Sequence, residues 1–375
     1  MTLQFPKGFL WGSATSAYQV EGGIENNDWA KVFPAGKACD HYNRYEEDFE
    51  LVQQLNQNAH RFSLEWSRIE PQEGVFDKKE IEHYRRVLQS LKQKNISTMV
   101  TLHHFTTPLW LAEKGGWANS KTVFYFSRFA QKMFEEYHNL VDFWITINEP
   151  TNYATIGYLQ GRWAPNKHNP VLFLQVVKNL IAGHKAAYQK IHDISSQANV
   201  GVAKGYVFFE GIGTSVLGYL YNNYFLNKIQ KQLDFIGLNY YFHSRRNFLF
   251  LERNENNIVS DINWEIYPKG LYHVLKDAAQ YSLPLYITEN GLSDAKDKLR
   301  EDFIKNHVTW MHKAISEGVN CKGYFHWSLL DNFEWEKGFE PRFGLIEIDY
   351  KTFKRTPRAS AKYYAHICKT NQLES

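Results

Sequence analysis

The sequence contains few cysteines and no long apolar run. Its three cysteines, Cys39, Cys321 and Cys368, are odd in number and lack metal-ligand spacing, so we expect reduced, separate thiols. No stretch of about 18 apolar residues occurs, which argues against a membrane span. The first residues, MTLQFPKGFLWGSAT, lack the charged and apolar regions of a secretory signal. We therefore expect a cytoplasmic protein.

The charge balance argues against nucleic acid as a partner. The chain has 43 Lys and Arg against 40 Asp and Glu, a net charge of +3, whereas a nucleic-acid binder carries a clustered basic surface. A linker rich in Pro, Gly and Ser is also missing, and the composition does not change sharply along the chain. Two domains are the alternative, but these features favour a single domain over residues 1–375.

Aromatic residues are abundant instead. They make up 16% of the chain, with 11 Trp, 23 Tyr and 26 Phe. The core of a domain uses some of them. The surplus suits a site for sugars, whose C–H faces pack on aromatic rings while their hydroxyls need polar partners.

Eight short apolar runs alternate with longer amphipathic stretches. The runs are FLWGSAT, NAHRFSLEW, ISTMVTLHHF, VDFWITINEP, NVGVAKGYV, LDFIGLNYY, LPLYITENG and CKGYFHWSLL. Helices are predicted over Lys78–Lys94, Lys121–Leu140, Pro170–Ile194, Gly270–Tyr281 and Arg300–Glu317. This alternation predicts a closed (β/α)8 TIM barrel. The rival, an open doubly wound sheet, usually carries a glycine-rich phosphate loop after its first strand, and none is present.

The fifth β/α unit is the irregular part of this pattern. Residues 205–232 are crowded with Tyr, Phe and Gly, and only Gly218–Lys231 looks helical. A missing barrel helix would leave apolar strand surface uncovered. A contact between copies of the chain, that is a homo-oligomer, is one candidate for covering it.

Two carboxylate motifs point to chemistry. TINEP ends a predicted strand with Glu149, and ITENG ends another with Glu289. Barrel enzymes keep their active sites at the carboxyl ends of the strands. Two carboxyl groups that face one cavity can supply the acid and the nucleophile for breaking a glycosidic bond, and about 5–5.5 Å separates them in a retaining enzyme.

Polar or aromatic residues recur at the ends of seven of the eight predicted strands, as one site at the top of a barrel would require. They are Gln19, Glu21, Arg61, Glu65, His104, Asn148, Glu149, Asn239, Tyr241, Glu289 and Trp327. The adjacent pair His103 and His104 could suggest a metal. Neighbouring strand residues point to opposite faces, however, so the two rings are not expected to share one ion.

The motifs together resemble glycoside hydrolase family 1, the β-glucosidase family. The matching segments, in the family order, are FLWGSATSAYQVEGG, HRFSLEWSRIEP, TLHHF, TINEP, GLNYY, YITENG, and HWSLLDNFEW followed by RFG. The resemblance covers nearly the whole chain. It implies a retaining β-glycosidase that works through a covalent glycosyl-enzyme intermediate, on short, unphosphorylated β-glycosides, without a cofactor or metal.

The resemblance also implies individual roles. Glu149 matches the general acid/base and Glu289 the nucleophile. Arg61, Asn239 and Tyr241 match residues that support the nucleophile. The substrate-binding positions are matched by Gln19, His104, Asn148, Tyr241, Trp327, Glu334 and Trp335. The family often has a cis peptide bond after the position of Trp327.

The chain is shorter than most members of that family. The segment after the first strand and the stretch Gly205–Gln232 are abbreviated. The sugar-binding residues belong to the other units, so we expect the shortening to spare the chemistry and to open the aglycone side of the site. The segment Arg245–Phe250 is a candidate for rebuilding that side. Two rivals remain: a glycan-binding barrel without activity, and a transglycosylase that uses the same residues.

Overall fold

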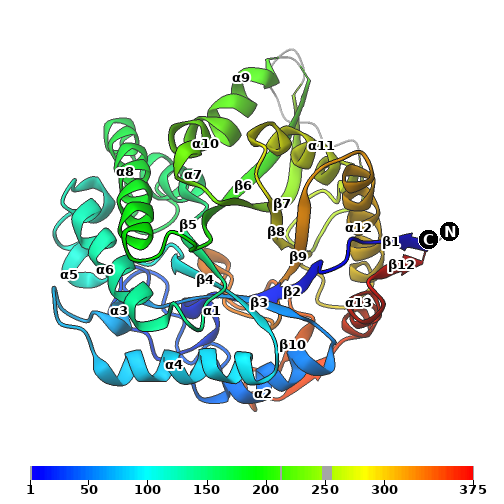
Figure 1. Ribbon diagram of the computed structural model, residues 1–375, viewed down its shortest axis with the longest axis horizontal. Helices are drawn as coiled ribbons and strands as arrows, with labels where there is room; N and C mark the ends of the chain where they lie inside the picture. The colour runs from blue at the N-terminus through cyan, green and yellow to red at the C-terminus, as the bar shows by residue number, and fades with distance from the viewer. Residues whose placement is uncertain (1, 212, 247–255, 375) are drawn as a thin grey trace.

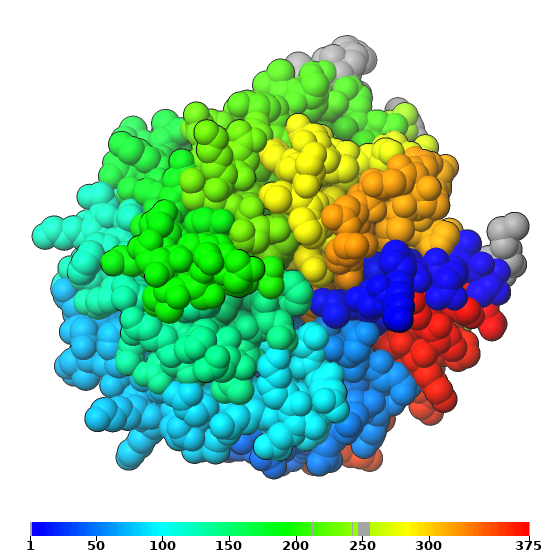
Figure 2. Space-filling view, viewed as in Figure 1, coloured from blue at the N-terminus to red at the C-terminus, as the bar shows by residue number. Residues whose placement is uncertain are grey.

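The computed structural model describes residues 2–211, 213–246 and 256–374. Eight parallel strands close into a barrel in chain order, as predicted (Figure 1). They are β2 (Leu10–Ala14), β3 (Ala59–Ser63), β4 (Ser97–His103), β5 (Phe143–Asn148), β6 (Val200–Gly211), β7 (Phe235–Arg246), β8 (Leu285–Asn290) and β9 (Cys321–Trp327). In Figure 2 the colours follow one another around the molecule, and the blue start of the chain meets its orange and red end.

Helices form a ring outside the strands (Figure 1). The long ones are α2 (His41–Gln54), α4 (Lys78–Gln93), α6 (Thr122–Tyr137), α8 (Pro170–Ile194), α11 (Pro268–Ala278), α12 (Arg300–Ser316) and α13 (Ala359–Thr370). Five of these match the predicted helices with ends shifted by no more than three residues. The start of α8 follows from its sequence, because the Asn169 side chain accepts from the Val171 and Leu172 amides while Pro170 occupies the first helical position.

Shorter elements decorate the barrel. The helices are α1 (Ala17–Val20), α3 (Trp66–Ile69), α5 (Leu109–Ala112), α7 (Pro150–Ala154), α9 (Thr214–Gly218) and α10 (Tyr224–Ile229). Two small antiparallel sheets pair β1 (Thr2–Gln4) with β12 (Gln372–Glu374) and β10 (Ile346–Ile348) with β11 (Arg355–Pro357). The first pair places the two ends of the chain side by side (Figure 1).

The barrel interior is packed rather than open. Phe143 on β5 and Tyr286 on β8 have ring centroids 5.2 Å apart, although their strands are not neighbours in the sheet. The contact therefore crosses the interior. Trp144, the next residue after Phe143, points the opposite way and belongs to the apolar layer between the strands and the surrounding helices. This alternation is the period of two that a strand imposes.

The fifth unit differs from the prediction in its extent. Strand β6 continues to Gly211, and β7 pairs with it as far as Arg246, so both run beyond the predicted segments. The helical part begins at Thr214, not Gly218, and consists of α9, the π-helical turn η3 (Tyr219–Asn223), α10 and a final 3-10 turn. The barrel stays closed because β6 pairs with both neighbours.

The fifth unit keeps a helix, α10, so the strand surface that a missing helix would leave uncovered is covered by the chain itself. Phe225, Leu226 and Ile229 of α10 are buried in the layer between the barrel and its helices. The apolar residues that remain exposed lie farther out on α9 and η3, and they are Val216, Leu217, Tyr219 and Leu220. Of the segment Arg245–Phe250, residues 247–250 lie outside the described residues.

The cysteine prediction is confirmed, since Cys39, Cys321 and Cys368 are free and buried. Among the described residues, no helix is both long and apolar enough to cross a bilayer. Within the same ranges, no group of three or more His, Cys, Asp or Glu side chains could hold a metal ion.

The loop after β9 is anchored by a buried carboxylate. Both oxygens of Asp331 accept from the Arg358 guanidinium, at 2.9 Å each, and Asp331 is fully buried. Arg342 and the Gly344 amide supply further donors. A paired buried charge of this kind fixes the path of the chain, because the pair cannot separate without stranding a charge in the interior.

Arg358→Met should therefore lower the free energy of unfolding by roughly 3 kcal/mol, because Asp331 would keep its burial and lose its bidentate partner. Denaturation in urea measures this. Arg44→Met, which removes a solvent-exposed ion pair with Asp40, is the matched control and should cost less than about 1 kcal/mol. Equal costs for the two variants would contradict the anchoring role of Asp331.

Candidate active site

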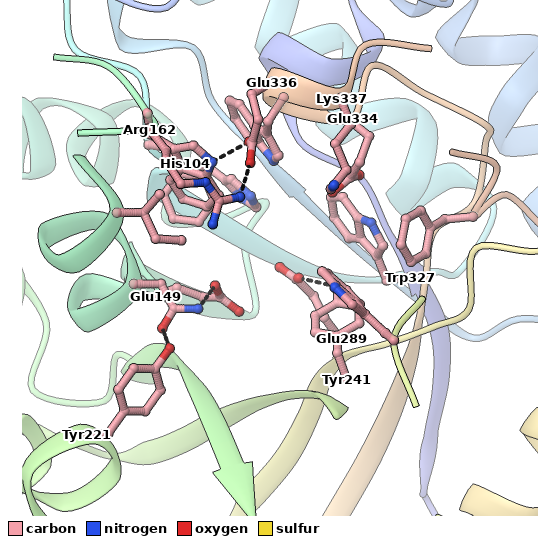
Figure 3. Close-up of a pocket in the computed structure, with 17 residues that line it drawn as sticks. His104, Glu149, Arg162, Tyr221, Tyr241, Glu289, Trp327, Glu334, Glu336 and Lys337 are labelled. Atoms are coloured by element: carbon pink, nitrogen blue, oxygen red, sulfur yellow. Dashed lines mark hydrogen bonds and ion pairs between the residues drawn. The ribbon is translucent and has the colours of Figure 1, made fainter. Parts of the chain in front are cut away.

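A cavity of about 270 Å³ lies at the carboxyl ends of the barrel strands. Seven of the eleven residues predicted for the site line it, namely His104, Glu149, Tyr241, Glu289, Trp327, Glu334 and Trp335 (Figure 3). The other four, Gln19, Arg61, Asn148 and Asn239, are almost fully buried and reach the cavity residues through hydrogen bonds. The sequence prediction and the structure therefore select the same region of the barrel.

Glu149 sits where β5 turns into α7. Its backbone amide donates to the Ala203 carbonyl of β6 at 2.7 Å, and Pro150 occupies the first helical position. The turn requires φ of 42° at Glu149, a left-handed conformation that non-glycine residues rarely adopt. Such strain persists where the surrounding structure fixes it, often at functional sites. It aims the side chain into the cavity.

Glu289 ends β8 and is held at both carboxylate oxygens. Arg61 of β3 donates to Oε1 at 2.6 Å, and the Tyr241 hydroxyl donates to Oε2 at 2.7 Å. The Glu289 side chain is 5% exposed and that of Arg61 is 1% exposed, so this ion pair is sheltered from water. Its geometry leaves Glu289 little rotational freedom.

A chain of amides joins the two glutamates. Arg61 also donates to Asn148 Oδ1 at 2.7 Å, and Asn239 donates to the same oxygen at 3.1 Å. Asn239 then donates to Glu149 Oε1 at 2.9 Å. Asn239 was grouped with the residues that support Glu289, and this role stays a prediction, because Asn239 is linked to Glu289 through Asn148 and Arg61. Its amide oxygen accepts from the Thr288 hydroxyl, and this bond turns the NH2 group toward Glu149.

The electrostatic environment of Glu149 favours its protonated form. Burial, and then the nearby negative charge of Glu289, raise the pKa of Glu149 to about 7, while Asn239, Lys204 and Arg61 act in the opposite direction. A carboxyl group with this pKa can give and take a proton near neutral pH. The site thus holds a carboxylate paired with a cation and a carboxyl group poised to exchange a proton.

The far side of the cavity is built from the loop after β9. Glu334 and Trp335 lie there, and Trp327 precedes them at the end of the strand, where its peptide bond to Ser328 is cis, as the resemblance implies. Gln19 supports this loop from below by donating to the Phe333 carbonyl at 2.9 Å. Burial, then the charge of Glu336, raise the pKa of Glu334 to about 8.

His104 lines the cavity between Asn148 on one side and the rings of Trp327 and Trp335 on the other. Burial holds the pKa of His104 well below its usual range, so the ring is neutral. Its Nε2 lies 3.2 Å from the Asn148 amide nitrogen. The neighbouring His103 points elsewhere and accepts from the Trp117 indole at 3.0 Å. The two rings therefore do not converge on one point, as the alternation of strand residues predicted.

Several cavity residues were not found from the sequence. They are Asn152, Ile156, Arg162, Trp163, Tyr221, Trp264, Glu336, Lys337 and Phe343. Closeness to a motif could have indicated some of them, because Asn152 follows TINEP and Glu336 follows Trp335. No local signal marks Tyr221. The sugar-binding residues were expected from the other units, and η3 of the fifth unit adds Tyr221 to the cavity wall (Figure 3).

Comparison with known proteins adds an independent line of evidence. The model of glycosyl hydrolase family 1 matches residues 1–215 and 222–373. Beta-glucosidase A of Thermotoga maritima is 34% identical, with 99% of each chain covered. A 6-phospho-beta-galactosidase of Staphylococcus epidermidis is 30% identical, with 100% of each covered. Among solved structures, a beta-glycosidase from Pyrococcus horikoshii superimposes with a TM-score of 0.95 at 36% identity, covering 100% of this chain and 97% of that one.

The site makes a titration prediction that does not depend on any substrate. Glu289→Gln should lower the pKa of Glu149, because it removes the neighbouring negative charge and leaves the burial unchanged. Infrared difference spectroscopy of the carboxyl band, with Glu149→Gln as the reference, follows this proton. An unchanged pKa in Glu289→Gln would show that the two carboxyl groups do not interact.

Proposed function

This chain belongs to glycosyl hydrolase family 1, and we propose that it hydrolyses short, unphosphorylated β-glycosides with Glu149 and Glu289 as its catalytic pair. It is a retaining β-glycosidase of the β-glucosidase type. The observation that supports the assignment of residues is their shared network: Arg61 and Asn239 connect both glutamates through Asn148.

In the first step, a Glu289 oxygen attacks the anomeric carbon while the bond to the leaving oxygen breaks. Glu149 gives its proton to that oxygen, and the product is a glycosyl ester of Glu289. Arg61 and Tyr241 hold the attacking carboxylate in place, so little motion is needed to reach the anomeric carbon. The raised pKa of Glu149 keeps about half of the acid protonated at neutral pH.

In the second step, water attacks the same carbon and Glu149 takes the proton of that water. The bond between the sugar and Glu289 breaks, and the sugar leaves with its original configuration. Once Glu289 is esterified its charge is gone, so one of the causes that raise the pKa of Glu149 disappears. Glu149 is then better suited to act as a base.

Glu289→Gln should remove nearly all turnover of an aryl β-glucoside while the protein remains folded, because an amide cannot attack the anomeric carbon. Glu289→Gly leaves a gap in which azide can act as the nucleophile, and we expect azide to restore activity and give the α-glycosyl azide. Steady-state kinetics with product analysis measures both. Turnover by Glu289→Gln near the wild-type level would refute the assignment.

Glu334 underlies the proposed preference for a free sugar hydroxyl over a phosphate. With a pKa of about 8, it is partly ionised at neutral pH and becomes more negative as the pH rises. A carboxylate repels a sugar 6-phosphate at short range and accepts hydrogen bonds from hydroxyls. Lys337 also lines the cavity, but it is exposed, and its charge is screened by water.

We therefore expect a higher kcat/KM for an aryl β-glucoside than for its 6-phosphate, with a ratio that grows between pH 7 and pH 9. Glu334→Ser should reduce the ratio and its dependence on pH. Lys337→Met serves as the control, and it should leave the preference in the same direction. Faster hydrolysis of the 6-phosphate by the wild-type enzyme would reverse the proposed substrate class.

Finer statements about the protein are also proposals. We infer one catalytic domain over residues 1–375 and a cytoplasmic location, which the three free cysteines support. The exposed apolar side chains of Val216 and Leu220 support a homo-oligomer, and light scattering of the purified protein tests it. The balance between hydrolysis and transfer to a second sugar is measured by analysing products at high substrate concentration.

A further inference from the structure

A chain of hydrogen bonds reaches Glu149 from the shortened fifth unit. The Tyr221 hydroxyl on η3 donates to Asn152 Oδ1 at 2.5 Å, and Asn152 Nδ2 donates to Glu149 Oε2 at 2.7 Å. Figure 3 shows Tyr221 reaching up from this unit toward Glu149. The other carboxylate oxygen, Oε1, accepts from the Asn239 amide, so an amide donor faces each oxygen of Glu149.

A buried lysine lies behind this chain. Lys204 on β6 is completely buried, and its Nζ donates to the Gly205 carbonyl at 2.6 Å rather than to a carboxylate. The same nitrogen lies 4.9 Å from the centre of the Tyr221 ring. Burying an ammonium group without a carboxylate partner opposes folding. Burial lowers the pKa of Lys204 to about 7, against the charge of Glu149, so this lysine carries its positive charge in only part of the molecules at neutral pH. An apolar side chain would fill the space without that cost, which makes the lysine a candidate functional residue.

Gly205 makes the arrangement possible. A Cβ atom at this position would lie 2.9 Å from both Asn152 Nδ2 and Asn152 Oδ1, closer than side chains approach. The backbone of Gly205 lies in the regular strand β6, so the site does not require glycine for its φ angle. Its small size leaves the room that the Asn152 amide occupies.

Part of this arrangement lies outside the residues that the family model matches. The match to the family model stops at residue 215 and resumes at residue 222, so Tyr221 lies in the unmatched stretch. The segment that is unlike the family thus reaches the carboxyl group on which the reaction depends.

We propose that Tyr221 and Lys204 are positioning residues for Glu149: Tyr221 fixes the Asn152 amide, this amide holds the carboxylate, and Lys204 supplies a buried positive charge. The inference rests on the proposed role of Glu149 as acid/base. An Asn side chain can present either its oxygen or its NH2 group to a neighbour. The Tyr221 hydroxyl donates to the oxygen, which leaves the NH2 group for Glu149.

The consequence for the reaction concerns mainly the second step. Both the Asn152 donor and the Lys204 cation stabilise ionised Glu149, the form that accepts a proton from water. Burial and the charges of Glu289 and Glu334 oppose ionisation, whereas Arg61 supports it, and Tyr241 faces the same cavity as a neutral phenol. Without Tyr221 or Lys204, the pKa of Glu149 should rise.

Three substitutions test this from different directions. Tyr221→Phe removes only the hydroxyl, Lys204→Met removes only the charge, and Gly205→Ala displaces the Asn152 amide. Tyr219→Phe, on the same π-helical turn, and Lys228→Met, an exposed lysine of α10, are the matched controls. Thermal unfolding of each variant is measured first, and Lys204→Met should be at least as stable as the wild type.

Two kinetic measurements separate positioning from folding. With 2,4-dinitrophenyl β-glucoside, whose leaving group needs no proton, kcat should fall about fivefold in each test variant, and azide should restore it because azide needs no base. With phenyl β-glucoside, the alkaline limb of kcat/KM should move to higher pH, because a raised pKa keeps Glu149 protonated longer. The controls should match the wild type in both.

The outcomes are distinct. If the wild type does not hydrolyse β-glucosides, the proposed function fails. If the wild type is active and the folded test variants keep its kcat and its alkaline limb, the positioning role is wrong. A fall in kcat that azide does not reverse also overturns it, because such a fall reflects general damage. Should one variant fail to fold, the other two decide.

Discussion

The buried guanidinium of Arg61 is the interaction on which the site depends. It donates to Thr101 of β4, to Asn148 of β5 and to Glu289 of β8, while its own backbone belongs to β3. One side chain therefore fixes the relative positions of four barrel strands at the level of the cavity. A guanidinium has five donors in a rigid plane, and a lysine at this position could not satisfy the same partners. The closed barrel in turn supplies the burial that strengthens each of these bonds.

This arrangement explains why two glutamates in one cavity behave differently. Glu289 is paired with a cation and a phenol, and its charge is balanced where it stands. Glu149 accepts hydrogen bonds from the neutral amides of Asn152 and Asn239. Burial and the negative charge of Glu289 are therefore the main causes of its raised pKa. When the environments of two carboxyl groups push their pKa values apart in this way, they determine which group is the acid and which is the nucleophile. The identity of the residues alone does not.

Most of the fold could be predicted from the sequence, because the strands that form the barrel are short apolar runs with polar residues at one end. The helix bounds followed from amphipathic stretches and, at Asn169 and Pro170, from capping residues. The fifth unit was harder. Its extended strands depend on pairing between β6 and β7, and a pairing between distant segments leaves no local pattern.

The same reason separates the site residues that were found from those that were missed. Glu149, Glu289 and Trp327 stand in motifs, whereas Tyr221 becomes a site residue only because a π-helical turn carries it over α7 to Asn152. The hydrogen-bond partners of Asn239 could not be predicted for a related reason. A strand-end amide has two neighbours within reach, and the Thr288 hydroxyl decides which of them receives its NH2 group.

The shortened unit shows which parts of such a barrel can be reduced. The Thermotoga maritima relative aligns over 448 positions, against 375 residues here, so parts of it have no counterpart in this chain. What this chain keeps in the fifth unit is the strand that closes the barrel, the apolar side chains that cover it, and the turn that carries Tyr221. The barrel has to stay closed at this strand, because the Glu149 backbone amide donates to the Ala203 carbonyl of β6 and this bond positions Glu149. The connecting helix can be short here, since the three apolar side chains of α10 are buried against the barrel and cover the strand.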